Sequence, residues 1–345
     1  MTNEVVFTVN DNGLATITLN RPQALNSLSY VMVKEIGSKL NEWKTNSDIC
    51  IVVIRGAGEK GLCAGGDIKS LYEAGSNEAS LQAAERFFAE EYEVDQQIYH
   101  FPKPIIACLD GIVMGGGVGL TYGASHRIVT ERTKWAMPEM NIGFFPDVGA
   151  AYFLNKATGY IGRYLALTAK TIGPSDVLYI HAADHYMTSE ALEHFITKIT
   201  SIDWHHTELP SVLDHLIDEY ASSPERSSSL SLLQHEVDQH FGFSTVEEII
   251  DSLVGATDFE MDTKNLLLTK SPVSLKVTLK QLIDGEEKTI QECFATDLIL
   301  AKNFMRHSDF FEGVRSVLIN KGKTPNYKYE KLSDVSNELI NDFFS

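Results

Sequence analysis

The sequence predicts an α/β protein with a parallel sheet, and two segments carry this prediction. Residues 51–71 and 105–124 each run from an apolar segment through a glycine-rich loop into the start of a helix. The apolar segments are continuous, which is typical of strands buried on both faces of a parallel sheet. Strands that alternate with helices in this way favour parallel β/α organisation.

The other elements follow in chain order from the spacing of apolar residues. Residues 5–9 and 14–19 flank the turn sequence Asn10-Asp11-Asn12-Gly13, which predicts a β-hairpin. Ser29 is expected to cap a helix that extends to about Asn41. We further expect a strand at residues 176–180, and helices at 73–100, 150–154, 161–169, 290–305 and 311–319 and from Ser189 and Ser271 onward.

The amino-acid composition of the chain changes near residue 200. From residue 201 the sequence becomes more polar and richer in histidine, and it still reads as mostly helical. We therefore expect a ligand-binding core at residues 1–200 and a mainly helical C-terminal region at residues 201–345 that completes the site.

Composition narrows the class of protein. The 345 residues are 43% hydrophobic and 22% charged, as in a globular domain, and the net charge of −18 argues against nucleic acid or an anionic membrane as a partner. The four cysteines are scattered and mostly lie in apolar runs, so we expect buried, reduced thiols. The N-terminus shows no targeting pattern, and the cytoplasm is the expected compartment. Homo-oligomerisation is left open.

The glycine run Gly115-Gly116-Gly117 lies between an apolar strand and a helix start. Glycine lets the backbone turn sharply and approach a ligand closely, and a helix N-terminus offers unpaired N–H groups that suit a developing oxyanion. Gly65-Gly66 occupies the matching place in the first unit. By itself that pair could be only a tight turn, but two matching loops favour an oxyanion hole.

Two carboxylates, Glu139 and Asp147, stand among methionine, phenylalanine, isoleucine and proline. Glu139 could cap a helix after Pro138, and Asp147 could serve a turn after Pro146. A carboxylate in apolar surroundings is costly unless it has a partner or a function, and burial should raise its pKa. The sequence therefore makes both residues candidates for catalysis.

Other reactive side chains have simpler explanations. His205, His206, His235 and His240 lack the cysteines or the HExxH spacing of a zinc site, so we expect solvated helix residues and no metal. Cys63 has no histidine arranged to activate it and is expected to be a buried thiol.

Three motifs in order resemble the crotonase (enoyl-CoA hydratase/isomerase) superfamily: NRPQALN at 20–26, AGGDI at 64–68 and MGGG at 114–117. The resemblance covers the chain from the first hairpin to about Leu192, with a weaker match at residues 311–315. It implies a crotonase-like spiral of ββα units, with two roughly perpendicular sheets and a helical C-terminal region.

Within the superfamily the chain is most similar to the branch that hydrolyses 3-hydroxyisobutyryl-CoA. The similarity lies in residues 87–92, 114–120, 136–139, 143–149 and 271–276. The hydratases of the superfamily carry a glutamate at the position of Gly119, and two glutamates together hold the water that they add. Here that glutamate is missing, and Asp147 appears instead.

The resemblance implies an acyl-CoA thioester as substrate. The backbone N–H groups of Gly66 and Gly116 would hold its carbonyl oxygen, and Glu139 would act as nucleophile or as general base; the sequence leaves both open. Asp147 would accept a hydrogen bond from the substrate's 3-hydroxyl or help to protonate the thiolate. The remaining substrate-binding candidates are Glu91, Ala24, Ala64, Asp67 and Ile68. Glu91 would otherwise be one of many solvated helix charges.

This assignment needs no cofactor, since coenzyme A is part of the substrate, and it would place the chain in valine catabolism. Two alternatives stay open at this stage. One is an enoyl-CoA hydratase or isomerase that uses Glu139 alone. The other is a structural protein that keeps the fold without turnover, which the intact Gly66, Gly116, Glu139 and Asp147 argue against.

Overall fold

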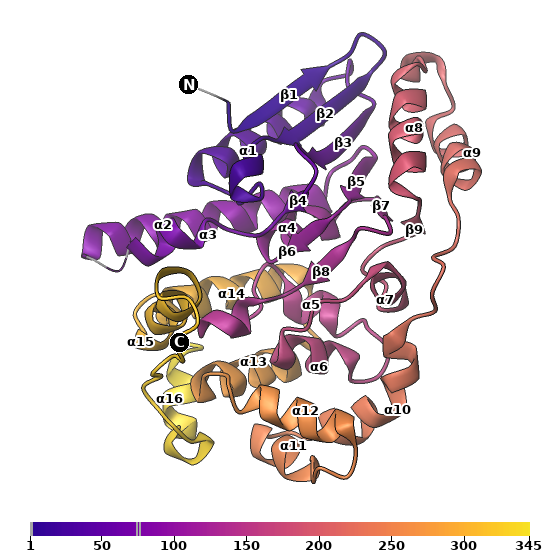
Figure 1. Cartoon of the computed structure of the whole chain (residues 1–345). Helices are drawn as coiled ribbons and strands as arrows, with labels where there is room; N and C mark the ends of the chain where they lie inside the picture. The colour runs from indigo at the N-terminus through magenta and orange to yellow at the C-terminus, as the bar shows by residue number, and fades with distance from the viewer. Residues whose placement is uncertain (1–2, 74, 76) are drawn as a thin grey trace. The chain divides into compact units, whose positions relative to one another are not determined.

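The computed structural model describes residues 3–73, 75 and 77–345 (Figure 1). The chain forms two compact units, each built from three segments. Unit 1 comprises Met1–Gly66, Glu93–Trp135 and Ile172–Ser228; unit 2 comprises Asp67–Tyr92, Ala136–Thr171 and Ser229–Ser345. Neither unit begins or ends at residue 200. A binding core at residues 1–200 whose site is completed by residues 201–345 stays a prediction.

Unit 1 contains a six-stranded sheet in the order β1-β2-β3-β5-β7-β9. Its strands are β1 Val5–Val9, β2 Leu14–Leu19, β3 Ile51–Gly56, β5 Ile105–Leu109, β7 His126–Val129 and β9 His185–Tyr186. The first pair is the predicted antiparallel hairpin, with Gly13 at φ +86° in its turn. All other pairs are parallel. The two runs that predicted a parallel sheet, β3 and β5, are its central neighbours.

A second sheet in unit 1 has three short strands in the order β4-β6-β8. They are β4 Gly61–Cys63, β6 Ile112–Met114 and β8 Lys134–Ala136. Sequence patterns did not predict these strands, because three residues are too few to show a periodicity. Two of them lead directly into the glycine loops of the candidate site.

Unit 1 also contains helices, which are α1 Tyr30–Thr45, α4 Gly116–Tyr122, α7 Pro174–Tyr179, α8 Ser189–Thr200 and α9 Leu209–Tyr220. Of these, α1 packs against β1 and α4 against β4 and β6. Ser29 caps α1 as predicted, accepting a hydrogen bond from the Met32 amide, but the helix continues past Asn41 to Thr45. The expected strand at 176–180 is wrong. That segment belongs to α7, because Pro174 sits at the first helical position, where its fixed φ favours a helix start.

Unit 2 is mostly helical. Its helices are α2 Ile68–Glu73, α5 Ala150–Leu154, α6 Ile161–Thr168, α10 Ser229–Phe241, α11 Val246–Ser252, α12 Asp258–Leu267, α13 Pro272–Gly285, α14 Ile290–Phe304, α15 Ser308–Val314 and α16 Asn337–Asp342. The long helix α3 Glu78–Tyr99 contributes residues to both units. Where one helix was expected at 311–319, α15 passes into a π-helical turn at Arg315–Ile319. Helices α13 and α14 both pack against α5.

The prediction of buried thiols holds for three of the four cysteines, and Cys50 is half-buried. The four cysteines are free, and Cys63, Cys108 and Cys293 are buried. Within the part of the chain that the structure describes, no helix combines the length and the hydrophobicity that a bilayer crossing needs.

Candidate active site

In unit 1 the two glycine loops lie against each other. Gly65 has φ +103° and Gly115 has φ +51°, and residues other than glycine rarely adopt such backbone angles. A methyl group added to Gly65 would lie 3.3 Å from the Met114 carbonyl oxygen and 3.6 Å from the Gly116 amide nitrogen. The glycines therefore allow this close approach of two backbone segments.

The approach brings two candidate donors together in unit 1. Leu28 forms a parallel bridge with Gly66 in which the Leu28 amide donates to the Gly65 carbonyl at 2.8 Å, so this bond leaves the Gly66 amide unused. Gly116 is the first residue of α4, and the N–H of that position has no partner within the helix. Among the described residues neither N–H donates to a backbone acceptor. Their use as an oxyanion hole remains a prediction.

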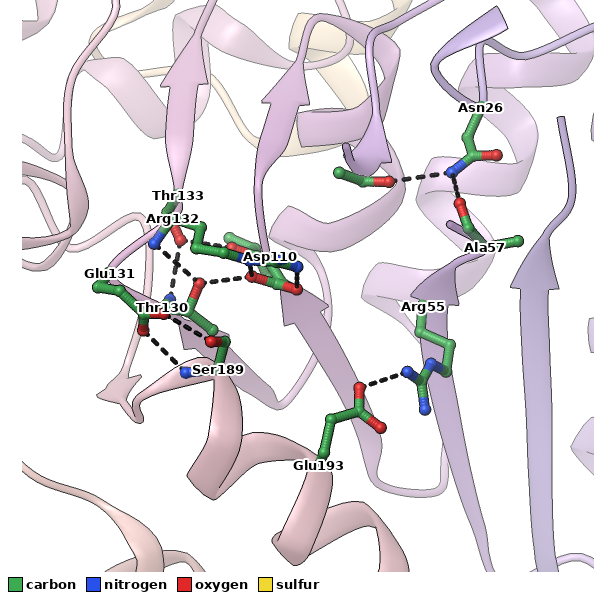
Figure 2. Close-up of polar contacts among 12 residues, drawn as sticks. Asn26, Arg55, Ala57, Asp110, Thr130, Glu131, Arg132, Thr133, Ser189 and Glu193 are labelled. Atoms are coloured by element: carbon green, nitrogen blue, oxygen red, sulfur yellow. Dashed lines mark hydrogen bonds and ion pairs between the residues drawn. The ribbon is translucent and has the colours of Figure 1, made fainter. Parts of the chain in front are cut away.

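Asn26, for which the sequence alone predicts no role, joins the loops of unit 1 (Figure 2). Its side chain is buried, and its Nδ2 donates to the carbonyls of Ala57 at 3.0 Å and Gly61 at 2.9 Å. Its Oδ1 accepts from the Arg21 amide at 2.9 Å. Asn26 thus ties the NRPQALN loop, which carries Ala24, to the glycine loop that leads to Ala64. The one hint in the sequence was the residue type, because asparagine tolerates positive φ better than most other residues. In the structure Asn26 has φ +56°.

In unit 2 Glu139 opens a short 3-10 turn, Glu139–Ile142, directly after Pro138. The residue is 8% exposed, and in the described structure its buried Oε2 has no hydrogen-bond partner. Burial, followed by the charge of Asp147, raises the pKa of Glu139 well above its usual range. Glu139 is therefore a desolvated carboxyl with hydrogen-bonding capacity to spare, as a nucleophile or general base requires.

Asp147 is 5% exposed and accepts a hydrogen bond from the Tyr92 hydroxyl at 2.7 Å. Burial raises the pKa of Asp147 to about 6, and the bond from Tyr92 opposes this rise because it favours the ionised form. Tyr92 belongs to residues 87–92, which carry part of the family resemblance, and the sequence alone predicts no role for it. Burial, reinforced by the nearby Asp147 charge, raises the pKa of Tyr92 well above its usual range, so this hydroxyl is a donor at neutral pH.

Aromatic rings provide the low-dielectric surroundings of these carboxyls in unit 2. Phe144 stacks on Phe88 with ring centroids 5.6 Å apart and contacts Phe145 at 4.6 Å. The Tyr92 ring lies 5.8 Å from that of Phe294. Apolar surroundings have a low dielectric constant, which agrees with burial as the main cause of the raised pKa values of Glu139 and Asp147.

The other substrate-binding candidates of unit 2 lie on two helices. Glu91 is 3% exposed on α3, so its interpretation as one of many solvated helix charges is wrong. Asp67 accepts from the Ser70 amide at 3.4 Å at the start of α2, whose first residue is Ile68. A capping function for Asp67 is thus visible, and a substrate role for these three residues stays a prediction.

Gly119 lies in α4, buried in unit 1, and as a glycine it brings no carboxylate to that helix. Cys63 is buried against the carbonyl of Gly65, as expected, and His206 is 84% exposed beside Asp203. The expectation of a solvated side chain is wrong for His240, which is 2% exposed because α10 packs against α6 and α11. Its Nδ1 lies 3.0 Å from the Ser252 hydroxyl. No group of three or more metal-ligating side chains occurs among residues 3–73, 75 and 77–345.

A separate polar cavity of about 380 Å³ lies in unit 1, between the ends of β3 and β5 and the start of α8. None of the predicted site residues lines it. Arg55 pairs with Glu193 at 2.5 Å, and the Arg132 guanidinium is held by Asp110 with an Nε–Oδ1 distance of 2.9 Å (Figure 2). Because both cations lining the cavity already have carboxylate partners, we assign it no ligand.

Comparison with known proteins agrees with the motifs. The sequence profile of enoyl-CoA hydratase/isomerase matches residues 14–344. The chain belongs to the enoyl-CoA hydratase/isomerase family. It is 38% identical over 336 residues to a protein of Danio rerio named 3-hydroxyisobutyryl-CoA hydrolase, mitochondrial, covering 95% of this chain and 86% of that protein. Its identity to the Homo sapiens protein of the same name is 39% over 332 residues, covering 95% and 85%.

Solved structures confirm the crotonase-like fold of this family member. The structure of a carnitinyl-CoA dehydratase from Mycobacterium thermoresistibile superimposes with a TM-score of 0.92 at 31% identity, covering 100% of this chain and 97% of that one. The predicted fold class, including a helical C-terminal region, is therefore confirmed.

Proposed function

We propose that this chain hydrolyses acyl-CoA thioesters and that 3-hydroxyisobutyryl-CoA is its preferred substrate. The relatives with 38–39% identity carry that activity in their names. The observation that carries the proposal is the environment of Asp147. It is a buried carboxyl for which Tyr92 is the one side-chain hydrogen-bond donor among the described residues. A carboxylate can accept several hydrogen bonds, so Asp147 retains capacity for a substrate hydroxyl.

In the proposed reaction the N–H groups of Gly66 and Gly116 stabilise the thioester oxygen as it becomes negative. Removing one such donor typically costs about 3 kcal/mol of transition-state stabilisation. Glu139 then either attacks the carbonyl carbon, giving a mixed anhydride that water cleaves, or deprotonates the attacking water. Both routes require the ionised form of Glu139 and release a carboxylic acid and free coenzyme A.

The protonation of Asp147 supports an acceptor role. With a pKa of about 6 the carboxyl is mostly ionised at neutral pH, so it is better prepared to accept the hydrogen bond of a 3-hydroxyl than to protonate a thiolate. A site that pairs a buried acceptor with a substrate hydroxyl discriminates strongly against an analogue that lacks the hydroxyl.

The reaction requires no cofactor besides the coenzyme A of the substrate, so hydrolysis should survive treatment with a metal chelator. The named substrate would place the enzyme in valine catabolism. We propose the cytoplasm as its compartment, whereas the relatives are named as mitochondrial proteins.

The substitution Asp147→Asn tests the proposal. It keeps the size of the side chain and removes the charge that would read the hydroxyl. We expect kcat/KM for 3-hydroxyisobutyryl-CoA to fall much further than kcat/KM for isobutyryl-CoA, followed as thiol release with each thioester. Equal losses for both substrates would leave Asp147 without a role in recognising the hydroxyl.

A further inference from the structure

A buried clamp holds the turn that carries Asp147, and it consists of two side chains that the proposed reaction does not use. Asp297 on α14 accepts a hydrogen bond from the Gly149 amide through Oδ2 at 2.8 Å. Gln281 on α13 donates through Nε2 to Asp297 Oδ1 at 2.8 Å and to the Pro146 carbonyl at 2.9 Å. The clamp therefore grips the chain one residue before Asp147 and two residues after it.

The turn needs such a restraint because its backbone is strained. Val148, the residue directly after Asp147, has φ +51°. This backbone conformation is unusual for any residue other than glycine, and it is an outlier for a β-branched residue such as valine. Strain of this kind typically costs about 1–3 kcal/mol and persists only where the surroundings fix the geometry. Without the clamp the turn could relax and re-aim the Asp147 carboxyl.

The clamp itself is expensive to bury. Asp297 is fully buried and Gln281 is 2% exposed. Burial raises the pKa of Asp297 to about 8, and the hydrogen bonds from Gly149 and Gln281 oppose that rise since they favour the ionised form. Nearby charges on Asp147 and Lys288 act in opposite directions on the same carboxyl. An apolar residue would fill the space at lower cost, so packing alone does not account for a carboxyl here.

We propose that Asp297 is a positioning residue that sets the preference for hydroxylated thioesters by fixing the turn from Pro146 to Gly149. This inference rests on the proposed function, since it presumes that Asp147 reads the substrate hydroxyl. Asp297 touches no substrate in this scheme and acts through the backbone on both sides of Asp147. Supporting groups that orient a functional side chain can matter nearly as much as the side chain itself.

The substitution Asp297→Asn tests the clamp. Both oxygens of Asp297 accept a hydrogen bond, from Gly149 and from Gln281, whereas an amide has only one acceptor atom. At least one of the three hydrogen bonds of the clamp is therefore lost, whichever way the two amides turn. We expect the ratio of kcat/KM for 3-hydroxyisobutyryl-CoA to that for isobutyryl-CoA to fall about tenfold, because a displacement of ~1 Å can cost 10²-fold in rate. The rate with isobutyryl-CoA, which has no hydroxyl to align, should change little.

Two further variants make the result interpretable. Glu260→Gln is the matched control, because Glu260 is also a buried carboxyl of unit 2 that accepts backbone amides, from Gly255 and Ala256, both at 2.9 Å. It should leave the substrate ratio unchanged even if the protein melts at a lower temperature. Gln281→Met removes the other half of the clamp at similar volume. It should reproduce the loss of preference and serves as the test if Asp297→Asn does not fold.

The outcomes separate the inference from the proposed function. A wild-type preference that Asp297→Asn and Gln281→Met abolish supports the clamp. A wild-type preference that both variants keep, or an equal loss with both substrates, overturns the inference and leaves the proposed function intact. A wild-type protein with no preference for the hydroxylated thioester overturns both.

Discussion

Replacing Tyr92 with phenylalanine removes one hydroxyl, and with it the 2.7 Å hydrogen bond to Asp147. A hydrogen bond to an ionised group contributes about 1.5–3 kcal/mol, and one pKa unit corresponds to about 1.4 kcal/mol. The pKa of Asp147, about 6 with the bond in place, should therefore rise to roughly 7 to 8 in Tyr92→Phe. At pH 7 the ionised fraction would fall from about 90% to between about 10% and 50%.

Tyr92→Phe should therefore lose hydrolytic activity at neutral pH and regain it at higher pH. Hydrolysis of 3-hydroxyisobutyryl-CoA at pH 7 should fall by about two- to tenfold, in proportion to the ionised fraction of Asp147. It should recover toward the wild-type rate near pH 9, where the carboxyl ionises again. Isobutyryl-CoA should be little affected.

The assay is a pH profile of coenzyme A release with both thioesters, for wild type, Tyr92→Phe and a matched control. Tyr164→Phe serves as that control, because the Tyr164 hydroxyl is buried in unit 2 and has no hydrogen-bond partner in the described structure. It should leave both profiles unchanged. If the loss in Tyr92→Phe is the same at every pH, the hydroxyl acts through packing alone, and the electrostatic account of Asp147 is refuted.

Three further outcomes follow from the site. Glu139→Gln removes both nucleophile and base while keeping the shape, so hydrolysis should collapse with acyl-CoA binding retained; near-normal turnover would exclude Glu139 from the mechanism. Because Gly119 supplies no second carboxylate, wild type should hydrate crotonyl-CoA far more slowly than it hydrolyses its best thioester, measured as loss of enoyl absorbance. Gly117→Ala would place a methyl group 2.6 Å from the Cys63 carbonyl oxygen, and chemical denaturation should show a loss of about 1–3 kcal/mol in the free energy of unfolding.

Local patterns in the sequence predicted the long elements. The hairpin, β3 and β5 followed from apolar runs, α1 from helical spacing and its Ser29 cap, and α14 from helical spacing. The three-residue strands β4, β6 and β8 carry no detectable period, and α7 is too short for its apolar residues to distinguish strand from helix. Here proline at the helix start was the better guide.

In the candidate site, too, some residues could be predicted from the local sequence and others could not. Glu139 and Asp147 could be predicted because a carboxylate among apolar residues is conspicuous in a sequence, and the glycine loops because of their motifs. Tyr92 and Asp297 could not be assigned roles, since their partners are 55 and 148 positions away in the chain. A tyrosine in an apolar helix face and an aspartate in a long helix have ordinary explanations until the fold brings them to one turn.

The most direct measurement is the kcat/KM of the wild-type chain for 3-hydroxyisobutyryl-CoA and for isobutyryl-CoA, followed as release of free coenzyme A. The two thioesters differ by the one hydroxyl that Asp147 is proposed to bind. The account predicts rapid release from the hydroxylated thioester and a much lower kcat/KM for the plain one, because a buried acceptor left without its donor is costly. Equal values would reduce the assignment to a general acyl-CoA thioesterase, and no release from either would contradict hydrolysis itself.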